Sequence, residues 1–236
     1  MARPIAVVTG GAVRVGAAIS RTLAEAGYAV VVHAWHHVAE ATALAAALDG
    51  HVAIADLLDP QGVFALMAAV DALPGALAVL VNNAAIFERS APEAVQPAQW
   101  QRHLTLNLTA PFQLCQLAHP RMTGGGCIVN ILDISALRPY PDFVHYSAAK
   151  AGLLAVTRGL AAAWGPTIRV NAVAPGPVLA PEGVDASGFA ARVARTPLGR
   201  APGAEAVAKA VRFLVQDAPG ITGEILHIDG GRRAAW

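Results

Sequence analysis

The chain has 236 residues, of which 17 are basic and 16 acidic, for a formal net charge of +1. This length suits one α/β domain over residues 1–236, and the lack of a basic run makes nucleic acid and membrane surfaces unexpected partners. Apolar residues make up 55%, yet runs such as 28–32 and 77–81 are far shorter than the roughly 20 residues of a spanning helix. The two cysteines, Cys115 and Cys127, are expected to be core residues, and the N-terminus has no signal-peptide pattern. We therefore expect a cytoplasmic protein.

Short apolar, β-branched runs alternate with alanine-rich helical segments along the chain. Strands are predicted at 5–9, 28–35, 51–56, 77–83, 127–132, 167–175 and 224–229. Helices are predicted at 14–26, 38–48, 60–72, 97–120, 146–164 and 204–217, with an irregular stretch at 176–203. Continuous apolar strands that alternate with helices are typical of a parallel sheet covered on both faces. The sequence therefore predicts a single α/β domain with a Rossmann-type, doubly wound sheet of about seven parallel strands.

A glycine-rich turn, TGGAVRVG, follows the first strand and leads into a helix. Gly10, Gly11 and Gly16 would let the backbone turn tightly and approach a pyrophosphate at the helix N-terminus, and a purely structural turn is the alternative. Arg14 stands where a dinucleotide-binding fingerprint has glycine. Because guanidinium binds phosphate in a bidentate manner, we expect Arg14 to contact either the cofactor phosphates or a substrate.

The end of the second strand indicates the type of nucleotide. An acidic residue there would bind both ribose hydroxyls and repel a 2′-phosphate, but the sequence has His33, His36 and His37. Imidazoles can donate hydrogen bonds to an anion, so NADPH is favoured over NADH; the alternative is that these histidines only cap the strand. Without Cys or acidic ligands nearby, no metal site is expected. Asp56, after the third strand, fits either an acceptor for the adenine amino group or a helix N-cap.

The segment YSAAK places Tyr146 and Lys150 four residues apart, on one face of a predicted helix. A lysine ammonium near a phenol favours the phenolate and lowers the tyrosine pKa from about 10 toward working pH. Tyr146 would then be able to donate or accept a proton. A surface-exposed pair is the alternative for this motif on its own.

The glycine turn, NNAA, YSAAK, APGPV and DGG occur in the order and approximate spacing of the short-chain dehydrogenase/reductase family, which the chain resembles over essentially its whole length. The resemblance implies an NAD(P)H-dependent oxidoreductase in which Asn107, Tyr146 and Lys150 are catalytic and Lys150 also holds the nicotinamide ribose. It further implies a homo-dimer or homo-tetramer. The residues expected to contact the cofactor are Gly10, Arg14, Val15, His33, His36, His37, Asp56, Leu57, Asn83, Ala84, Lys150, Pro175 and Gly176.

Asp133 departs from the family pattern, which has a serine thirteen residues before the catalytic tyrosine. Ser135 lies two positions further on, roughly 6 to 7 Å along an extended chain, and is not taken as the missing serine. Asp133 could form an Asx turn or a salt bridge to Arg138. Alternatively it is catalytic, because a carboxyl group held partly neutral by burial can pass a proton to a ring nitrogen through Tyr146 or water. Asp133 beside Tyr146 would then oppose the effect of Lys150 on the phenol, and Asp133 and Tyr146 would titrate as a coupled pair.

Arg14 in the glycine turn, combined with Asp133 in the serine position, resembles the pteridine reductase branch, including dihydromonapterin reductase-like enzymes. Phe87 matches the aromatic residue that stacks on the pterin in that branch, so Arg14, Phe87, Asp133 and Tyr146 are the expected substrate contacts. The branch would have serine at Ala85 and arginine near His36, and both are absent here. We therefore predict an NADPH-dependent reductase of a pterin or dihydropterin.

Two other functions are compatible with the sequence. A carbonyl reductase of the same family would act on oxoacyl or quinone substrates, and a non-catalytic nucleotide-binding protein would keep the fold without the chemistry. The intact Asn107, Tyr146 and Lys150 argue against the second of these. The stretch at about 177–200 is expected to be the substrate loop, and its composition suggests a lid.

Overall fold

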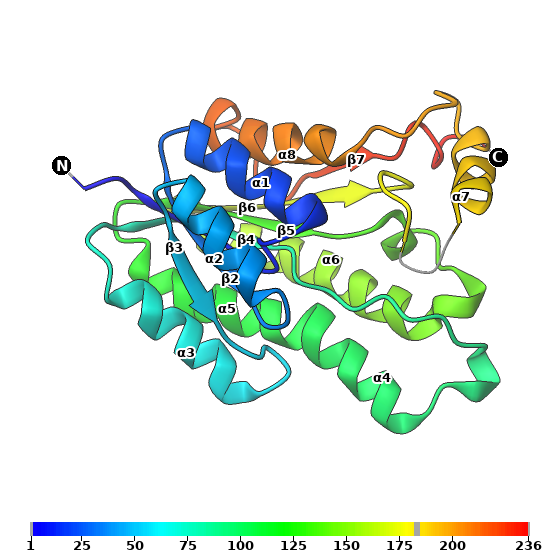
Figure 1. Cartoon of the computed structure of the whole chain (residues 1–236), viewed down its shortest axis with the longest axis horizontal. Coiled ribbons are helices and arrows are strands. Elements are labelled where there is room, and N and C mark those ends of the chain that lie inside the picture. The colour runs from blue at the N-terminus through cyan, green and yellow to red at the C-terminus, as the bar shows by residue number, and fades with distance from the viewer. Residues whose placement is uncertain (1, 182–184, 236) are drawn as a thin grey trace.

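Seven parallel strands form the centre of the molecule in the computed structural model, which describes residues 2–181 and 185–235 (Figure 1). The strands are β1 (Ile5–Val8), β2 (Ala29–Ala34), β3 (His51–Ile54), β4 (Leu77–Asn82), β5 (Gly126–Ile131), β6 (Ile168–Pro175) and β7 (Ile225–Ile228). Their order is β3-β2-β1-β4-β5-β6-β7. The predicted single-domain, doubly wound sheet is confirmed; residues 1 and 236 of the predicted domain lie outside the described residues. The order reverses between β1 and β4, which is where such sheets bind ligands.

Helices cover both faces of the sheet, as Figure 1 shows. On one face lie α1 (Arg14–Glu25), α2 (Val38–Ala47) and α8 (Ala204–Arg212). On the other lie α3 (Pro60–Asp71), α4 (Pro97–Leu104), α5 (Ala110–Ala118) and α6 (Val144–Trp164). Successive strand residues point to opposite faces, so Ala6 and Val8 enter the first core layer while Ile5 and Val7 enter the second.

Two predicted elements need correction. The helix predicted at 97–120 is divided into α4 and α5 by a wide π-type turn, Thr105–Thr109. The stretch predicted to be irregular at 176–203 contains α7 (Ala186–Ala194), whose N-cap Asp185 accepts a hydrogen bond from the Gly188 N–H at 2.8 Å. Residues 182–184 of the predicted substrate loop lie outside the described residues.

Short helical turns complete the described chain. They are Pro92–Ala94, His119–Arg121, Ile134–Ala136, Pro141–Phe143 and the π-type turn Phe213–Asp217. Within residues 2–181 and 185–235, no helix is both long and apolar enough to cross a membrane. The same residues contain no cluster of His, Cys, Asp and Glu that could hold a metal ion.

Candidate active site

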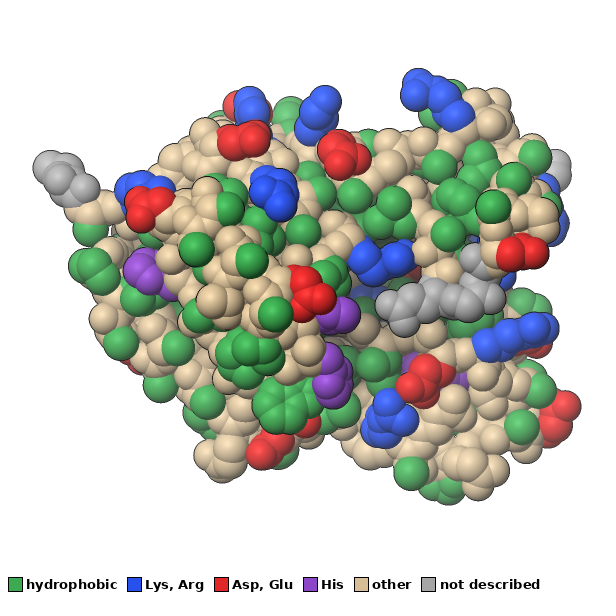
Figure 2. All heavy atoms as spheres, in the orientation of Figure 1, with side chains coloured by type: hydrophobic (Ala, Val, Ile, Leu, Met, Phe, Trp, Pro, Cys, Tyr) green, Lys and Arg blue, Asp and Glu red, His purple; other side chains and the backbone are tan. Residues whose placement is uncertain are grey.

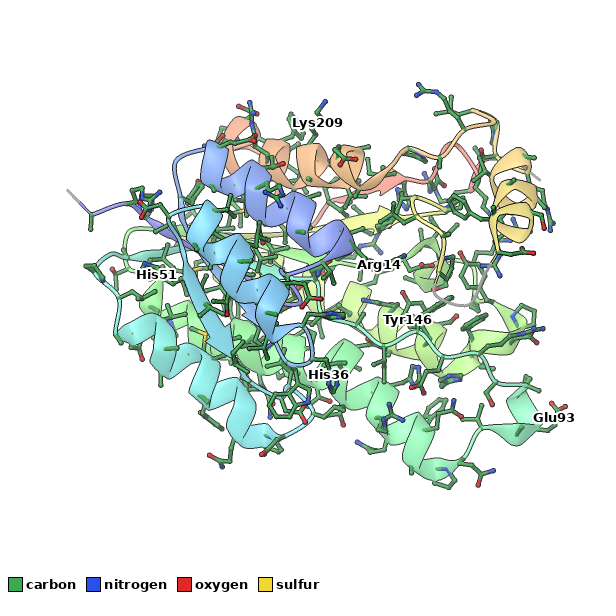
Figure 3. The ribbon with its side chains drawn as sticks, viewed as in Figure 1. Arg14, His36, His51, Glu93, Tyr146 and Lys209 are labelled. Carbon is green, nitrogen blue, oxygen red and sulfur yellow. The ribbon has the colours of Figure 1, made fainter. Side chains whose placement is uncertain are left out.

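A cleft of about 430 Å³ opens at the carboxyl ends of β1 to β4. Its lining includes most of the residues predicted to bind the cofactor, namely Gly10, Arg14, Val15, His33, His36, His37, Asp56, Leu57, Asn83 and Ala84. Figure 2 shows histidine and basic side chains around a hollow in this face. Figure 3 labels Arg14 and His36, which line the cleft, and Tyr146, which is not among the lining residues. A second cavity, of about 360 Å³, includes Tyr28 and Arg169 and contains none of the predicted site residues.

The glycine turn is held tightly against the end of β4. Gly10 has a φ of +59°, and a Cβ added to Gly16 would lie only 1.9 Å from the Gly10 carbonyl oxygen. The Asn83 Nδ2 donates to the carbonyls of Thr9 and Gly10 at 2.9 and 3.0 Å. The Thr9 hydroxyl accepts from the backbone N–H groups of Asn83 and Ala84. These contacts fix the turn that begins α1.

The N-terminus of α1 fits a dinucleotide pyrophosphate. Val13 is its N-cap and offers no side-chain hydrogen bond, and the first turn contains no acidic residue. The N–H groups of the first helical turn therefore lack a side-chain acceptor at the edge of the cleft, and they favour a bound anion.

His33 is placed differently from the prediction. Its ring is buried, its Nδ1 accepts from the Gly10 N–H at 3.1 Å, and its Nε2–H donates to the Ala55 carbonyl at 3.0 Å. Burial lowers the pKa of His33 to about 4, so the ring is neutral. Both ring nitrogens are already bonded within the protein, and His33 consequently has no N–H to offer a 2′-phosphate.

The outer part of the nucleotide end is more exposed. His36 and His37 lie at the cleft surface, and His37 Nδ1 is 3.5 Å from Glu40 Oε1. Asp56 forms an Asx turn, with its Oδ1 accepting from the Leu58 N–H at 2.9 Å. The N-cap of α3 is Asp59 rather than Asp56, so the helix-cap alternative for Asp56 is wrong and its carboxylate remains in the cleft lining.

Arg14 adopts a strained backbone conformation, and its side chain reaches the segment after β6. Its φ is +53°, a region that favours glycine. Its guanidinium donates to the Ala180 carbonyl at 2.6 Å, in the segment that follows β6. Pro175 ends β6, and Gly176 is fixed by close approach to Asp229, because an added Cβ would lie 2.8 Å from the Asp229 Cα.

Asp133 lies just beyond the end of β5, where it caps the turn Ile134–Ala136. Its Oδ1 accepts from the Ser135 N–H at 2.7 Å, which is the Asx arrangement left open by the sequence. The charge of its carboxyl group raises the pKa values of Tyr140 and Tyr146. Burial raises the pKa of Asp133, against the lowering effects of its hydrogen bonds and of Lys150. Asp133 is therefore the cap of this turn and an ionisable group beside Lys150.

Tyr146 and Lys150 lie side by side on α6, both buried. The Lys150 Nζ is 5.8 Å from the Tyr146 ring centroid and donates to the Ile131 carbonyl at 2.7 Å. Burial lowers the pKa of Lys150 to about 8. The pKa of Tyr146 differs from the expected direction: burial, and then the Asp133 charge, raise it well above its ordinary value. Tyr146 thus carries its proton at neutral pH and can act as a donor.

Asn107 sits in the wide turn between α4 and α5 and is fully buried. Its side-chain amide pairs with the backbone of Ile86, accepting from the N–H and donating to the carbonyl, each at 3.1 Å. Pro111 stands four residues later and cannot donate the hydrogen bond that an α-helix would send to the Asn107 carbonyl. This explains why the helix widens there, and the turn fixes the segment leading to Phe87.

Two other aromatic rings pack against Phe87. Phe143 stacks on it with ring centroids 4.1 Å apart and planes 3° apart, and Tyr146 meets it at 4.8 Å and 75°. The Arg89–Asp142 ion pair, at 2.6 Å, ties the segment after Phe87 to the one before α6. Sequence reasoning missed Phe143 and Tyr140; their proximity to YSAAK was the available signal.

Comparisons with known proteins agree with this geometry. Residues 11–233 match a family model described as enoyl-(acyl carrier protein) reductase, one of the short-chain dehydrogenase/reductase models. The chain belongs to the short-chain dehydrogenase/reductase family. It is 41% identical to the cis-4-hydroxycyclohexanecarboxylate dehydrogenase of Sinomonas cyclohexanicum, covering 99% of this chain and 98% of that one.

Solved structures of family members also match. One is the alternative dihydrofolate reductase 1, FolM, of Brucella suis in complex with NADP, with a TM-score of 0.92, 34% identity, and coverage of 99% of this chain and 96% of that one. Another is an angucycline C-6 ketoreductase with bound NADP, with a TM-score of 0.90, 29% identity, and coverage of 97% and 95%. The protein is an NAD(P)-dependent oxidoreductase of this family.

Proposed function

We propose that this short-chain reductase uses NADPH to reduce a pterin or dihydropterin. The observation that carries the proposal is the Asp133 carboxyl group in place of the family's serine, where its charge raises the pKa of the Tyr146 hydroxyl. A ketone's developing oxyanion is stabilised by neutral donors and opposed by a carboxylate, whereas reduction of a C=N bond needs a proton at nitrogen. The likeness to the dihydrofolate reductase of Brucella suis supports the same substrate class.

The proton would come from Tyr146 as hydride reaches the neighbouring carbon. NADPH supplies that hydride when bound. Tyr146 is protonated at neutral pH, and Asp133, whose pKa is raised by burial, can return a proton to the phenol. Lys150 would hold the ribose and contribute positive charge. Hydride on carbon and a proton on nitrogen together complete the reduction of the C=N bond.

The preference for NADPH follows from charge at the end of β2. No carboxylate stands at positions 33–37, and Glu40, nearby on α2, is paired with His37. His36, His37 and Arg14 remain as candidate phosphate contacts, since His33 is fully bonded within the protein. The NADP complexes among the similar structures support this choice.

The test follows consumption of NADPH and of NADH with dihydrobiopterin, dihydromonapterin and dihydrofolate. We expect turnover of at least one pterin, with NADPH giving the higher kcat/KM. Failure with all three, in protein that binds NADPH, would reject the pterin proposal, whereas equal use of NADH would reject only the cofactor preference.

A ketoreductase is the second candidate, because one face of Phe87 is already covered by Phe143. A pterin must use the remaining space or displace Phe143, while a bulky conjugated ketone, as the angucycline ketoreductase likeness suggests, would use the site differently. Ketone reduction that rises in the Asp133→Ser variant would favour this alternative. The dimer or tetramer and the cytoplasmic location stay predictions, and the two buried, unpaired thiols Cys115 and Cys127 are compatible with a reducing compartment.

A further inference from the structure

Buried side chains hold the backbone on both sides of Phe87. On its N-terminal side, the Asn107 amide bonds both backbone groups of Ile86, each at 3.1 Å. On its C-terminal side, the Glu88 carbonyl accepts from the His145 ring at 3.0 Å. Asn107 comes from the wide turn before α5, and His145 from the first turn of α6. The segment that carries Phe87 is thus bonded to two distant parts of the chain.

His145 is fully buried, and its bond to Glu88 identifies the ring nitrogen that carries a proton. A carbonyl oxygen can only accept, so Nε2–H is the donor, and Nδ1 keeps a lone pair in the neutral ring. Within residues 2–181 and 185–235, that buried Nδ1 has no hydrogen-bond partner. An unpaired buried acceptor costs free energy that an apolar side chain would not. The bond to Glu88 is therefore what a polar ring contributes at this position.

His103 supports the ring of His145 from α4, the helix beside α6 (Figure 1). The two rings meet edge to face, with centroids 4.1 Å apart and planes at 86°. His103 is also fully buried, and its Nδ1–H donates to the Gln99 carbonyl at 3.0 Å, within its own helix. Burial lowers the pKa of His103, so its ring is neutral at neutral pH and places no cation against His145.

Two further contacts join the segment after Phe87 to the turn before α6. The Ser90 N–H donates to the Asp142 carbonyl at 2.9 Å, and the Arg89 guanidinium pairs with the Asp142 carboxylate at 2.6 Å. The side chains of this ion pair are 76% and 41% exposed, so it contributes little on its own. The His145 bond is shielded from water and is electrostatically stronger.

We propose that His145 is a positioning residue that sets the place of the Phe87 ring in the substrate site. Its bond joins Glu88, which follows Phe87, to the residue that precedes Tyr146, whose ring meets Phe87 at 4.8 Å. The proposal rests on the proposed function, in which Phe87 contacts the substrate ring. Without the bond, the Phe87 segment could shift while Tyr146 kept its place on α6, and substrate binding would weaken.

The first experiment needs no substrate and makes one substitution at two buried histidines. His145→Leu and His103→Leu each remove an imidazole and an N–H bond to a carbonyl, but only the first loses a bond to the Phe87 segment. Hydrogen exchange is followed by NMR at the bonded amides of Ile86 and Ser90, with the β5 amides as the reference for global stability. Relative to that reference, exchange at both amides should be about tenfold faster in His145→Leu and unchanged in His103→Leu. Equal exchange in the two variants would overturn the proposal.

His145→Gln separates the hydrogen bond from the bulk of the ring. Glutamine also carries an N–H donor and should restore slow exchange at Ile86 and Ser90. Exchange as fast as in His145→Leu would show that the volume of the ring, rather than its N–H, holds the segment, and would refute the proposal.

A measurement on the wild type covers the case in which these variants do not fold. In protein labelled with ¹⁵N-histidine, the His145 ring signals are assigned through bonds to their own backbone, and they should show the proton on Nε2. A proton on Nδ1 alone would exclude donation to Glu88 and refute the contact.

Activity then tests the consequence for substrate binding. With a dihydropterin, His145→Leu should raise KM about tenfold with little change in kcat, whereas His103→Leu should leave KM unchanged. In the Phe87→Ala background, His145→Leu should add almost nothing to KM. Additive effects would refute action through Phe87. Absence of pterin turnover in the wild type would instead reject the proposed substrate, and the exchange and tautomer measurements would decide whether His145 fixes the segment.

Discussion

The nucleotide end and the reactive end of the site differ in how strongly their polar side chains are coupled to one another. At the nucleotide end, Thr9, His33 and Asn83 hydrogen-bond the backbone of neighbouring segments and leave the main chain to form the cradle. At the reactive end, Asp133 and Lys150 also bond backbone groups, the Ser135 N–H and the Ile131 carbonyl. Together with Tyr146, however, they form a set of ionisable groups, and burial shifts the pKa of each toward its neutral form.

The nucleotide end therefore sets the shape of the binding site, and the reactive end sets its chemistry. A polar side chain such as His33, whose two ring nitrogens are both hydrogen-bonded, costs little free energy to bury and keeps its position over a wide pH range. Groups that are buried beside other ionisable groups are coupled, so a change in one alters the others. Substitutions at the nucleotide end should therefore change binding and stability, and those at the reactive end should change turnover and its pH dependence.

Tyr146→Phe should give the largest effect and should confine it to turnover. Loss of the phenolic proton donor is expected to lower kcat about a thousandfold, within the range for removal of a general acid. The NADPH dissociation constant, measured by fluorescence titration, should remain within about twofold, since the ring is retained. Tyr28→Phe serves as the control and should keep full activity. A Tyr146→Phe enzyme with near-normal kcat would assign the proton donor elsewhere.

Gly16→Ala tests the nucleotide end in the complementary way. The new Cβ would lie 1.9 Å from the Gly10 carbonyl oxygen, and a backbone atom at that distance must move. We expect the turn to shift and NADPH affinity to fall by about two orders of magnitude, or roughly 3 kcal/mol.

Gly159→Ala is the matched control for that variant. It makes the same substitution in a helix at a position where nothing lies within 4 Å of the new atom. It should leave NADPH affinity unchanged and stabilise α6 by up to about 1 kcal/mol. Equal affinities for the two variants, determined by calorimetry, would contradict the close packing of the turn.

His33→Asn tests the pH dependence of the nucleotide end. Folding depresses the pKa of His33 from 6.5 to about 4, so between these values the unfolded chain binds a proton that the native state does not. Protonation of His33 in the unfolded chain therefore lowers the free energy of unfolding as pH falls through that window, by about 3 kcal/mol in total. In urea denaturation, the free energy of unfolding of the wild type should fall by that amount relative to His33→Asn between pH 7 and pH 4. Parallel stability curves would show that folding does not lower the pKa of His33.

The sheet could be predicted closely from the sequence, whereas parts of the site could not. Runs such as residues 5–8 and 29–32 are apolar throughout, and this pattern is typical of strands covered on both faces. The division of the helix at 97–120 was missed although Pro111 signals it, because the proline was read as part of a continuous helix. Helix α7 was missed because the surrounding Pro, Gly and Ser residues obscured the capping residue Asp185.

The site was predicted as a set of residues but not as a network of bonds. Spacing from Tyr146 located Asp133, and the structure brings the two together. Spacing could not reveal that the Asp133 charge also raises the pKa of Tyr140, because the connecting loop has no regular period. It also could not show that His33 turns inward to bond Gly10, since a strand-end imidazole can point either way.

Arg14 offers the smallest and most specific test, because its backbone strain and its side-chain contact can be separated. Arg14→Ala keeps a non-glycine residue at φ +53° and loses the bond to the Ala180 carbonyl, whereas Arg14→Gly loses the same bond and relieves the strain. Arg14→Gly should consequently be more stable than Arg14→Ala by about 1 kcal/mol, as measured by urea denaturation. Both should raise the KM for NADPH or for substrate to a similar extent, since both lack the guanidinium. If their KM values differ while their stabilities agree, backbone geometry rather than the arginine charge governs binding at this turn.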